Sequence, residues 1–162
     1  MSEDRSVKLD RMRFIKNTAS SRLALLAIVF DVLFFVSIYK SDVGSYYYNI
    51  LIGASILYNL IFMLATFLAS EGVKNYKRSF SWLMLVLGVI QVLRIFIIPT
   101  SAHSATVSVT GADVQVMGDA QFIRVTVYLM LSAVCLFSGA LINLNKSRAL
   151  AAHVASLDAQ KA

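Results

Sequence analysis

Apolar residues gather into four long stretches of the chain, separated by shorter polar segments. The stretches cover residues 23–39, 46–69, 80–99 and 122–142. A helix needs about 20 mostly apolar residues to cross the roughly 30 Å hydrocarbon core of a bilayer, where it must satisfy its own backbone hydrogen bonds. The pattern therefore predicts an all-α integral membrane protein, in which residues 1–162 form a single four-transmembrane-helix bundle.

The composition favours the same class of protein. Hydrophobic residues make up 58% of the chain and charged residues 15%, with a mean hydropathy of +0.71. Soluble domains are about 45–50% apolar and about 25% charged. A formal net charge of +6 would suit a nucleic-acid partner, but the basic residues flank the apolar stretches and no recognition motif accompanies them. A soluble domain and a nucleic-acid-binding protein are both excluded.

The basic residues also predict how the bundle is oriented, because Lys and Arg concentrate in cytoplasmic loops. Twelve of the fifteen lie before the first stretch, between the second and third, or after the fourth, whereas the other two loops contain only Lys40. Both termini are therefore expected to face the cytoplasm. The first stretch lacks a small-residue cleavage site before Lys40, so we expect a retained span rather than a signal peptide. The expected location is the plasma (inner) membrane or, alternatively, an organellar inner membrane.

The predicted outer loop, residues 100–121, contains no Lys or Arg and has an alternating pattern. Polar and β-branched residues alternate over 106–110 and 113–116, on either side of Gly111 and Ala112. Alternation around a two-residue loop with glycine first is typical of a hairpin with a type II′ turn. We expect a short extracytoplasmic β-hairpin, which is either plain surface structure or a contact for a partner or ligand.

The two ends of the chain are expected to lie at the cytoplasmic face. The basic segment 1–22 mixes Lys and Arg with apolar residues, which suits contact with anionic headgroups or a role in topology alone. In the tail, residues 143–162, helical spacing relates four positions: Leu150, Val154, Leu157 and Lys161. This spacing predicts a narrow amphipathic C-terminal helix, which lies on the membrane or docks on a partner.

Polar side chains inside the predicted spans mark the candidate functional site. Asp31, Asn59 and Gln91 each lie near the middle of a span, and Arg94 lies one turn outward from Gln91 on the same face. Ionisable residues in a membrane are costly and usually face the bundle interior. We therefore expect a buried ion pair between Asp31 and Arg94, with Asn59 and Gln91 satisfying the remaining groups. Its role is either cohesion between helices or the binding of a proton, an ion or a small solute.

Two further sets of residues have predicted roles. Arg124, near the outer end of the fourth span, is expected to reach the interface or to pair with Asp113 or Asp119 of the outer loop. Small residues recur at four-residue spacing in two pairs, Cys135 with Gly139 and Ala65 with Ala69. Such spacing lets helices approach closely within the bundle, in an oligomer or in a larger complex.

The sequence contains little catalytic chemistry. His103 and His153 fall on opposite sides of the membrane in the predicted topology, and Cys135 is the only cysteine. Because no metal, phosphate or nucleophile motif is present, we expect no enzyme activity, metal or cofactor.

The predicted function is therefore that of a non-catalytic accessory or scaffold subunit of a larger membrane complex. The alternative is a small oligomeric transporter or channel for an ion, proton or small solute, with Asp31 as the coupling residue. The expected partners are the lipid bilayer, with anionic lipid at the cytoplasmic face, and other membrane subunits or further copies of the chain.

Overall fold

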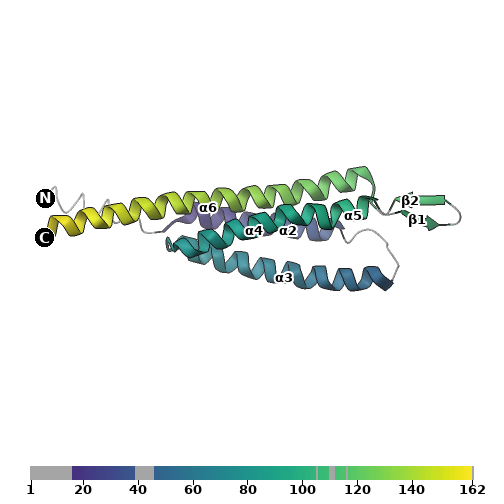
Figure 1. Cartoon of the computed structure of the whole chain (residues 1–162), viewed down its shortest axis with the longest axis horizontal. Coiled ribbons are helices and arrows are strands. Elements are labelled where there is room, and N and C mark those ends of the chain that lie inside the picture. The colour runs from purple at the N-terminus through teal and green to yellow at the C-terminus, as the bar shows by residue number, and fades with distance from the viewer. Residues whose placement is uncertain (1–15, 39–45, 105, 110–111, 116, 162) are drawn as a thin grey trace.

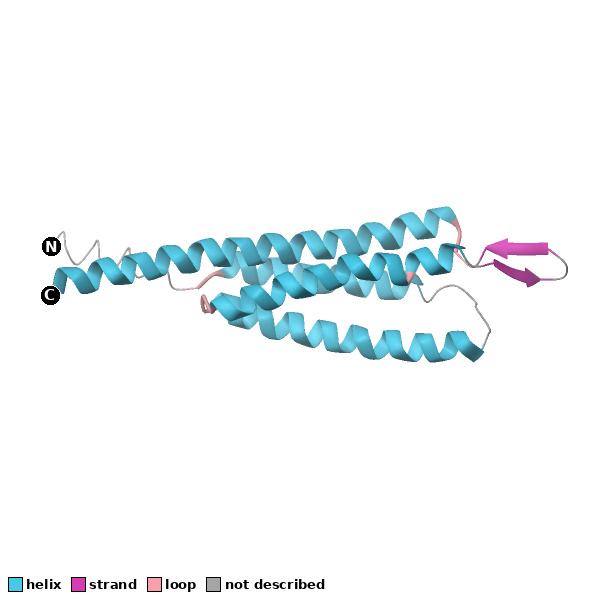
Figure 2. Cartoon of the chain, in the orientation of Figure 1, coloured by secondary structure: helices cyan, strands magenta, loops and turns pink. Residues whose placement is uncertain are grey.

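The structure is a computed structural model that describes residues 16–38, 46–104, 106–109, 112–115 and 117–161 (Figure 1). Helices make up nearly all of it (Figure 2). In chain order the elements are α2 (Thr18–Ile38), α3 (Tyr46–Lys74), α4 (Arg78–Ile97), α5 (Pro99–Ser104), β1 (Thr106–Val109), β2 (Ala112–Gln115) and α6 (Asp119–Lys161). The prediction of a helical membrane bundle is confirmed, since four helices in the described residues are long and apolar enough to cross a membrane.

The four long helices run roughly parallel to one axis (Figure 1). Helices α2, α4 and α6 lie together, whereas α3 diverges from them toward its N-terminal end (Figure 1). Small and large apolar side chains interlock in the centre, among them Ala27, Phe62, Met84 and Leu136, all at most 1% exposed. Many large apolar side chains instead point outward from all four long helices. An apolar outer surface around a packed interior is what a bundle in lipid requires.

A tight turn joins α3 to α4. Tyr76 has a positive φ of 58° there, and the Lys77 amide donates to the carbonyl of Gly72 at 3.2 Å. A Cβ atom on Gly72 would overlap the Cγ and Cδ atoms of the Phe80 ring. Glycine therefore lets the Phe80 ring pack directly on the backbone of α3, so the two helices reverse direction within a few residues.

All four long helices have different ends from the predicted spans. Helix α2 begins at Thr18 rather than at residue 23, and α3 continues to Lys74 rather than ending at 69. Polar residues in these added turns form hydrogen bonds inside the bundle. The hydroxyl oxygens of Ser21 and Ser70, for example, lie 2.8 Å apart. Hydropathy marks where lipid contact ends, whereas a helix continues as long as its backbone and polar side chains find partners.

The third span ends at a proline. Helix α4 stops at Ile97, and Pro99 begins the six-residue helix α5, so the first residues of the predicted loop 100–121 are helical. Proline suits the first position of a helix because it lacks an amide hydrogen and has its φ already fixed near the helical value.

Helix α6 corrects the largest error of the sequence analysis. The predicted span 122–142 and the separate tail helix form one continuous helix, Asp119–Lys161, of 43 residues. It contains one glycine, Gly139, and no proline, and its C-terminal part is rich in alanine, so nothing breaks it at the end of the apolar stretch. At 1.5 Å per residue α6 is about 65 Å long, twice the thickness of a hydrocarbon core.

Strands β1 and β2 pair antiparallel at the end of the bundle opposite the α3–α4 turn (Figure 1). Val109 pairs with Ala112, so residues 110 and 111 connect the strands. The sequence pattern had predicted that Gly111 and Ala112 form the two-residue loop, and this is wrong for Ala112. Residues 110 and 111 themselves lie outside the described part of the chain. An alternating pattern cannot distinguish the two registers, because both place valine opposite valine. Which side of the membrane the hairpin occupies stays a prediction.

Candidate functional site

An ion pair lies inside the bundle, between the middle of α2 and the C-terminal part of α4. The Nη1 atom of Arg94 donates to Oδ1 of Asp31 at 2.8 Å, and the two side chains are 4% and 0% exposed. Asp31 continues the buried face of α2 that includes Ala24, Ala27 and Phe34. The helical period thus directs the carboxylate into the bundle, where Arg94 neutralises its charge.

Three uncharged polar residues extend this pair to all four long helices. Gln91 donates from Nε2 to Oδ1 of Asp31 at 3.0 Å and to Oγ of Ser132 at 3.2 Å. Arg94 donates from Nη2 to Oδ1 of Asn59 at 2.7 Å. The Ser132 hydroxyl donates in turn to the backbone carbonyl of Ala27 at 3.0 Å. We call Asp31, Asn59, Gln91, Arg94 and Ser132 the polar cluster.

Two aromatic rings enclose the guanidinium of Arg94. Its central carbon lies 4.3 Å from the ring centroid of Phe34 and 4.6 Å from that of Tyr58. Both distances are within the range of cation–π attraction, which is stronger away from water. No sequence pattern predicted a role for these two rings. Their positions were the one available indication of this role: Phe34 lies three residues after Asp31, and Tyr58 directly precedes Asn59.

The polar cluster is not fully satisfied by the described residues. Buried atoms with no hydrogen-bond partner there include Oδ2 of Asp31, Nδ2 of Asn59 and the hydroxyl oxygen of Tyr58. Buried polar atoms in native proteins normally have a partner, so each of these atoms calls for an explanation.

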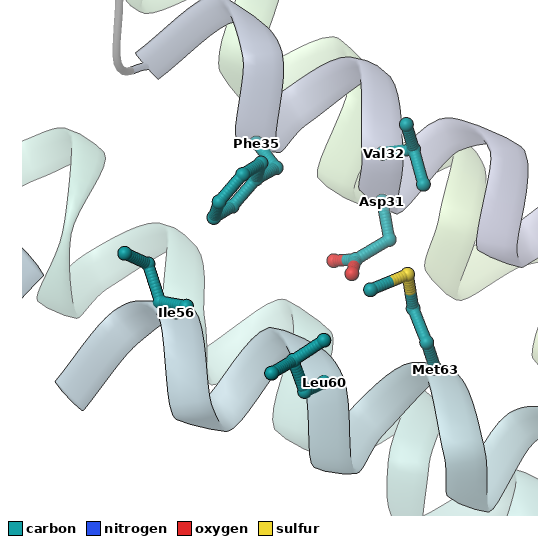
Figure 3. A pocket seen from close by; sticks show the side chains of 6 residues that line it. All are labelled: Asp31, Val32, Phe35, Ile56, Leu60 and Met63. Atoms are coloured by element: carbon teal, nitrogen blue, oxygen red, sulfur yellow. The ribbon is translucent and has the colours of Figure 1, made fainter. Parts of the chain in front are cut away.

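A small cavity lies beside Asp31. Its volume is about 80 Å³, and it is lined by Asp31, Val32 and Phe35 of α2 and by Ile56, Leu60 and Met63 of α3. Figure 3 shows the Asp31 carboxylate pointing from α2 toward α3, with the side chain of Met63 beside it. Val32 and Leu60 are 40% and 56% exposed on the outer surface, so the cavity lies next to the surface that faces lipid.

A second polar group, at the end of the bundle that holds the α3–α4 turn, was missed by the sequence analysis. Asn17 donates from Nδ2 to Oδ1 of Asn143 at 2.9 Å, and Asn143 donates from Nδ2 to Oγ of Ser81 at 2.7 Å. The backbone amide of Asn17 also donates to the carbonyl of Lys74 at 2.9 Å. Together these hydrogen bonds connect all four long helices at this end. Asn143 directly follows an apolar stretch, and this was the only signal of its role.

One of the alternatives predicted for Arg124, a pair with Asp119, does not form among the described residues. Asp119 faces His103, with Oδ1 and Nε2 3.6 Å apart, rather than Arg124. Arg124 is exposed, and the side chain of Asp113 lies outside the described residues. His103 also stacks on Phe122, at 4.6 Å between ring centroids, in the first turns of α6.

The small residues lie where helices approach one another. A Cβ atom on Gly139 would be 2.7 Å from Cε of Met84 and 3.3 Å from the carbonyl oxygen of Ser20. Cys135 and Ala69 are buried in the same core, and Ala65 packs against it. These positions therefore serve contacts within the bundle.

The polar cluster is an ion pair without net charge that has one open acceptor, Oδ2 of Asp31, and one open donor, Nδ2 of Asn59, among the described residues. The described residues contain no group of three His, Cys, Asp or Glu side chains placed to bind a metal. Comparison with protein-family models, with curated proteins and with solved structures found no match to this chain. The fold and the site thus define a helical membrane bundle with four candidate spans and a buried polar cluster.

Proposed function

We propose that the chain is a non-catalytic accessory or scaffold subunit of a larger membrane protein complex. The observation that carries the proposal is the C-terminal part of α6. The last contacts of α6 with the rest of the described bundle include Asn143, bonded to Asn17, and Lys146, whose Nζ donates to Oδ1 of Asn17 at 3.4 Å. Beyond them, residues 147–161 continue as a helix with no other described helix beside it (Figure 1). We call residues 147–161 the α6 extension, which thus begins directly after Lys146.

The direction of the α6 extension favours a protein partner over the membrane surface. It continues along the axis of the bundle (Figure 1), so it leaves the membrane rather than lying flat on it. An isolated helix of this length is marginal in water. Leu150 and Val154 lie one turn apart on one face, and Val154 is 47% exposed. A partner that covers this face would stabilise the extension.

The polar cluster supports the same function by cohesion. Its members tie α2, α3, α4 and α6 together at one level, and the bonds of Asn17 and Asn143 do so again at one end. Two such levels of polar contacts give a rigid bundle, which suits a subunit that presents binding surfaces at its ends.

Charge favours a cytoplasmic location for the α6 extension. Lys74, Lys77 and Arg78 lie at the α3–α4 turn, Lys146 lies directly before the α6 extension, and Arg148 lies in its first turn. Basic residues at one end of a bundle are typical of the cytoplasmic side. We therefore place both termini in the cytoplasm, the hairpin outside, and the chain in a plasma (inner) membrane whose anionic lipids contact this basic end.

A matched pair of variants tests the proposal. Val154→Lys places a charge on the apolar face of the α6 extension, and Ala152→Lys places the same charge about 200° around the helix. Tagged full-length chains are extracted from native membranes in mild detergent, and co-purifying polypeptides are quantified. We expect other subunits at fixed stoichiometry with the wild type and with Ala152→Lys, and their loss with Val154→Lys. A wild-type chain that purifies alone would contradict the proposal.

One observation favours the second candidate, a small oligomeric transporter or channel. The Oδ2 atom of Asp31 has no partner among the described residues, and Asp31 is among the residues that line a small cavity between α2 and α3. This candidate predicts that the wild-type chain mediates uptake of an ion or solute into vesicles, and that the folded fraction of Asp31→Asn mediates none. Loss of folded protein without any uptake by the wild type would favour the scaffold.

A further inference from the structure

The α6 extension meets the end of the bundle that holds the α3–α4 turn, and the two surfaces have different chemistry. The extension presents an apolar face, whereas the end of the bundle is basic. We propose that an acidic amphipathic helix of a partner polypeptide docks against both surfaces at once. The inference rests on the scaffold function proposed above, because it names the chemistry of the partner that the α6 extension binds.

The apolar face of the α6 extension continues the face by which α6 packs into the bundle. Val154 follows Leu136 by eighteen residues, which is five turns of helix, so both side chains project from the same side of α6. Leu136 is 0% exposed in the core, whereas Val154 is 47% exposed. Leu150 lies one turn before Val154 on this side. The apolar face is therefore on the side of α6 where the chain's own bundle lies.

Hydrogen bonds hold the basic α3–α4 turn against the foot of the α6 extension. The carbonyl of Lys77 accepts from Nδ2 of Asn143 at 3.3 Å. One turn of α6 further along, Nζ of Lys146 donates to Oδ1 of Asn17 at 3.4 Å. Two lysines thus lie within one or two turns of the place where the apolar face becomes exposed. A molecule that covers Leu150 therefore also meets positive charge.

Acidic side chains of the described residues do not balance this charge. Four basic residues are exposed around the foot of the extension: Lys77, Arg78, Lys146 and Arg148. The acidic side chain described at this end is that of Glu71, and it already pairs with Lys74 at 3.0 Å. Complementary charge steers and orients a partner. The basic end of the bundle therefore favours an acidic partner.

The apolar face itself favours a helix as the partner. Leu150 and Val154 are four residues apart, and the neighbouring Ser147 and Ala151 are small, so a second helix can approach closely. Amphipathic helices dock through apolar residues at this spacing. A partner helix whose apolar side covers Leu150 and Val154 can present acidic residues to the α3–α4 turn.

Two other occupants fit these surfaces less well. Helix α6 and its extension are one continuous helix along the axis of the bundle (Figure 1). A second copy in the same orientation, paired along the apolar face, would bring its own α6 into the space that α2 and α4 fill. The chain's own residues 1–15 include four basic and three acidic residues, so they do not supply net negative charge.

Site-specific photocrosslinking of the full chain in its native membrane tests the proposal. The crosslinker p-benzoylphenylalanine replaces either Ala151, beside the apolar face, or Ala152, on the opposite side of the helix. Peptide mass spectrometry then identifies the crosslinked segment. From position 151 we expect a segment of another polypeptide with net negative charge and apolar residues at helical spacing. Position 152 should crosslink the same segment about tenfold less, because it faces away from the apolar face.

Charge reversal provides the matched control. Lys77→Glu reverses one exposed charge but keeps the backbone carbonyl to which Asn143 donates. Lys77→Arg keeps the charge, and Arg124→Glu makes the same reversal at the opposite end of the bundle. We expect the crosslink yield from position 151 to fall about tenfold with Lys77→Glu and to persist with the other two variants. The SDS midpoint of each variant checks that the bundle is folded.

Several results would overturn the inference and leave the scaffold function standing, provided that other polypeptides still co-purify with the chain. They are a crosslinked segment that is neutral or basic, a crosslink to residues 1–15, to a second copy or to lipid, the lack of any crosslink, and a yield that Lys77→Glu leaves unchanged. A chain that purifies without other polypeptides would instead contradict the scaffold function itself.

Discussion

The Asp31–Arg94 pair supports a quantitative prediction about the stability of the bundle. Asp31→Asn keeps the shape of the side chain but leaves the buried guanidinium without its counterion. Arg94→Gln leaves the buried carboxylate with Gln91 as its remaining donor. The double variant contains neither charge. We expect each single variant to be strongly destabilised and the double variant to be much less unstable than the sum of the two.

The expected magnitude follows from the contacts. Removing one partner of a buried ion pair costs about 3–5 kcal/mol, because the other charge stays buried. Oδ1 of Asp31 accepts two hydrogen bonds, and bonds to charged groups contribute about 1.5–3 kcal/mol each. Their sum, about 3–6 kcal/mol, overlaps the range expected for breaking a buried ion pair. An uncharged hydrogen bond between membrane helices contributes only about 0.6 kcal/mol on average. A coupling energy of about 2 kcal/mol or more would therefore be specific to the ion pair.

Unfolding by SDS in mixed micelles gives these free energies. The transition is followed by near-UV circular dichroism and by the fluorescence of Trp82, the only tryptophan. Ser132→Ala is the control within the polar cluster, because it removes a neutral side chain that bonds to Gln91 and to the backbone of Ala27. Its expected cost is about 1 kcal/mol. Additive effects of Asp31→Asn and Arg94→Gln, or single effects no larger than that of Ser132→Ala, would refute the reasoning.

Three further predictions concern the packing and the ends of the helices. Gly139→Val should destabilise the bundle by about 1–3 kcal/mol, because the valine side chain would meet Met84 and the Ser20 carbonyl. The control Gly53→Val should leave the SDS midpoint almost unchanged, because a Cβ atom there has no neighbour within 4 Å. Asn143→Leu should lower the free energy of unfolding by about 1–3 kcal/mol and speed amide exchange around the α3–α4 turn, because Asn17, Ser81 and Lys77 lose their shared partner. An equal effect of the exposed control Asn145→Leu would contradict this prediction. Ala151→Pro should reduce the helix signal in far-UV circular dichroism by breaking the α6 extension, while the SDS midpoint stays the same because no described helix lies beside the extension (Figure 1). A lower midpoint would contradict this prediction.

Helix geometry and depth were sufficient to relate the central residues to one another. Asp31, Asn59 and Gln91 lie at similar depths in three apolar stretches, and a turn of helix relates Gln91 to Arg94. In the structure these four side chains are joined directly. Lipid restricts polar side chains to the interior, so residues at the same depth have few other partners available.

The remaining parts of the site depended on information that a hydropathy pattern does not contain. Phe34 and Tyr58 enclose Arg94 because of how α2 and α3 are rotated toward α4, and a pattern of apolar residues does not fix that rotation. Asn17 and Asn143 meet because α6 continues past the lipid boundary, where hydropathy falls but helix propensity does not. The cavity beside Asp31 arises from how side chains pack between α2 and α3, which one sequence does not specify.

The most direct test of the proposed function is the native mass of the particle that contains this chain. The full-length protein is extracted from its own membrane in mild detergent, and the mass of the intact particle is measured together with the masses of its components. We predict a particle in which the 17.9 kDa chain is accompanied by other polypeptides in a constant ratio. A particle whose mass is a whole-number multiple of the chain alone would contradict the scaffold function and favour a homo-oligomeric transporter.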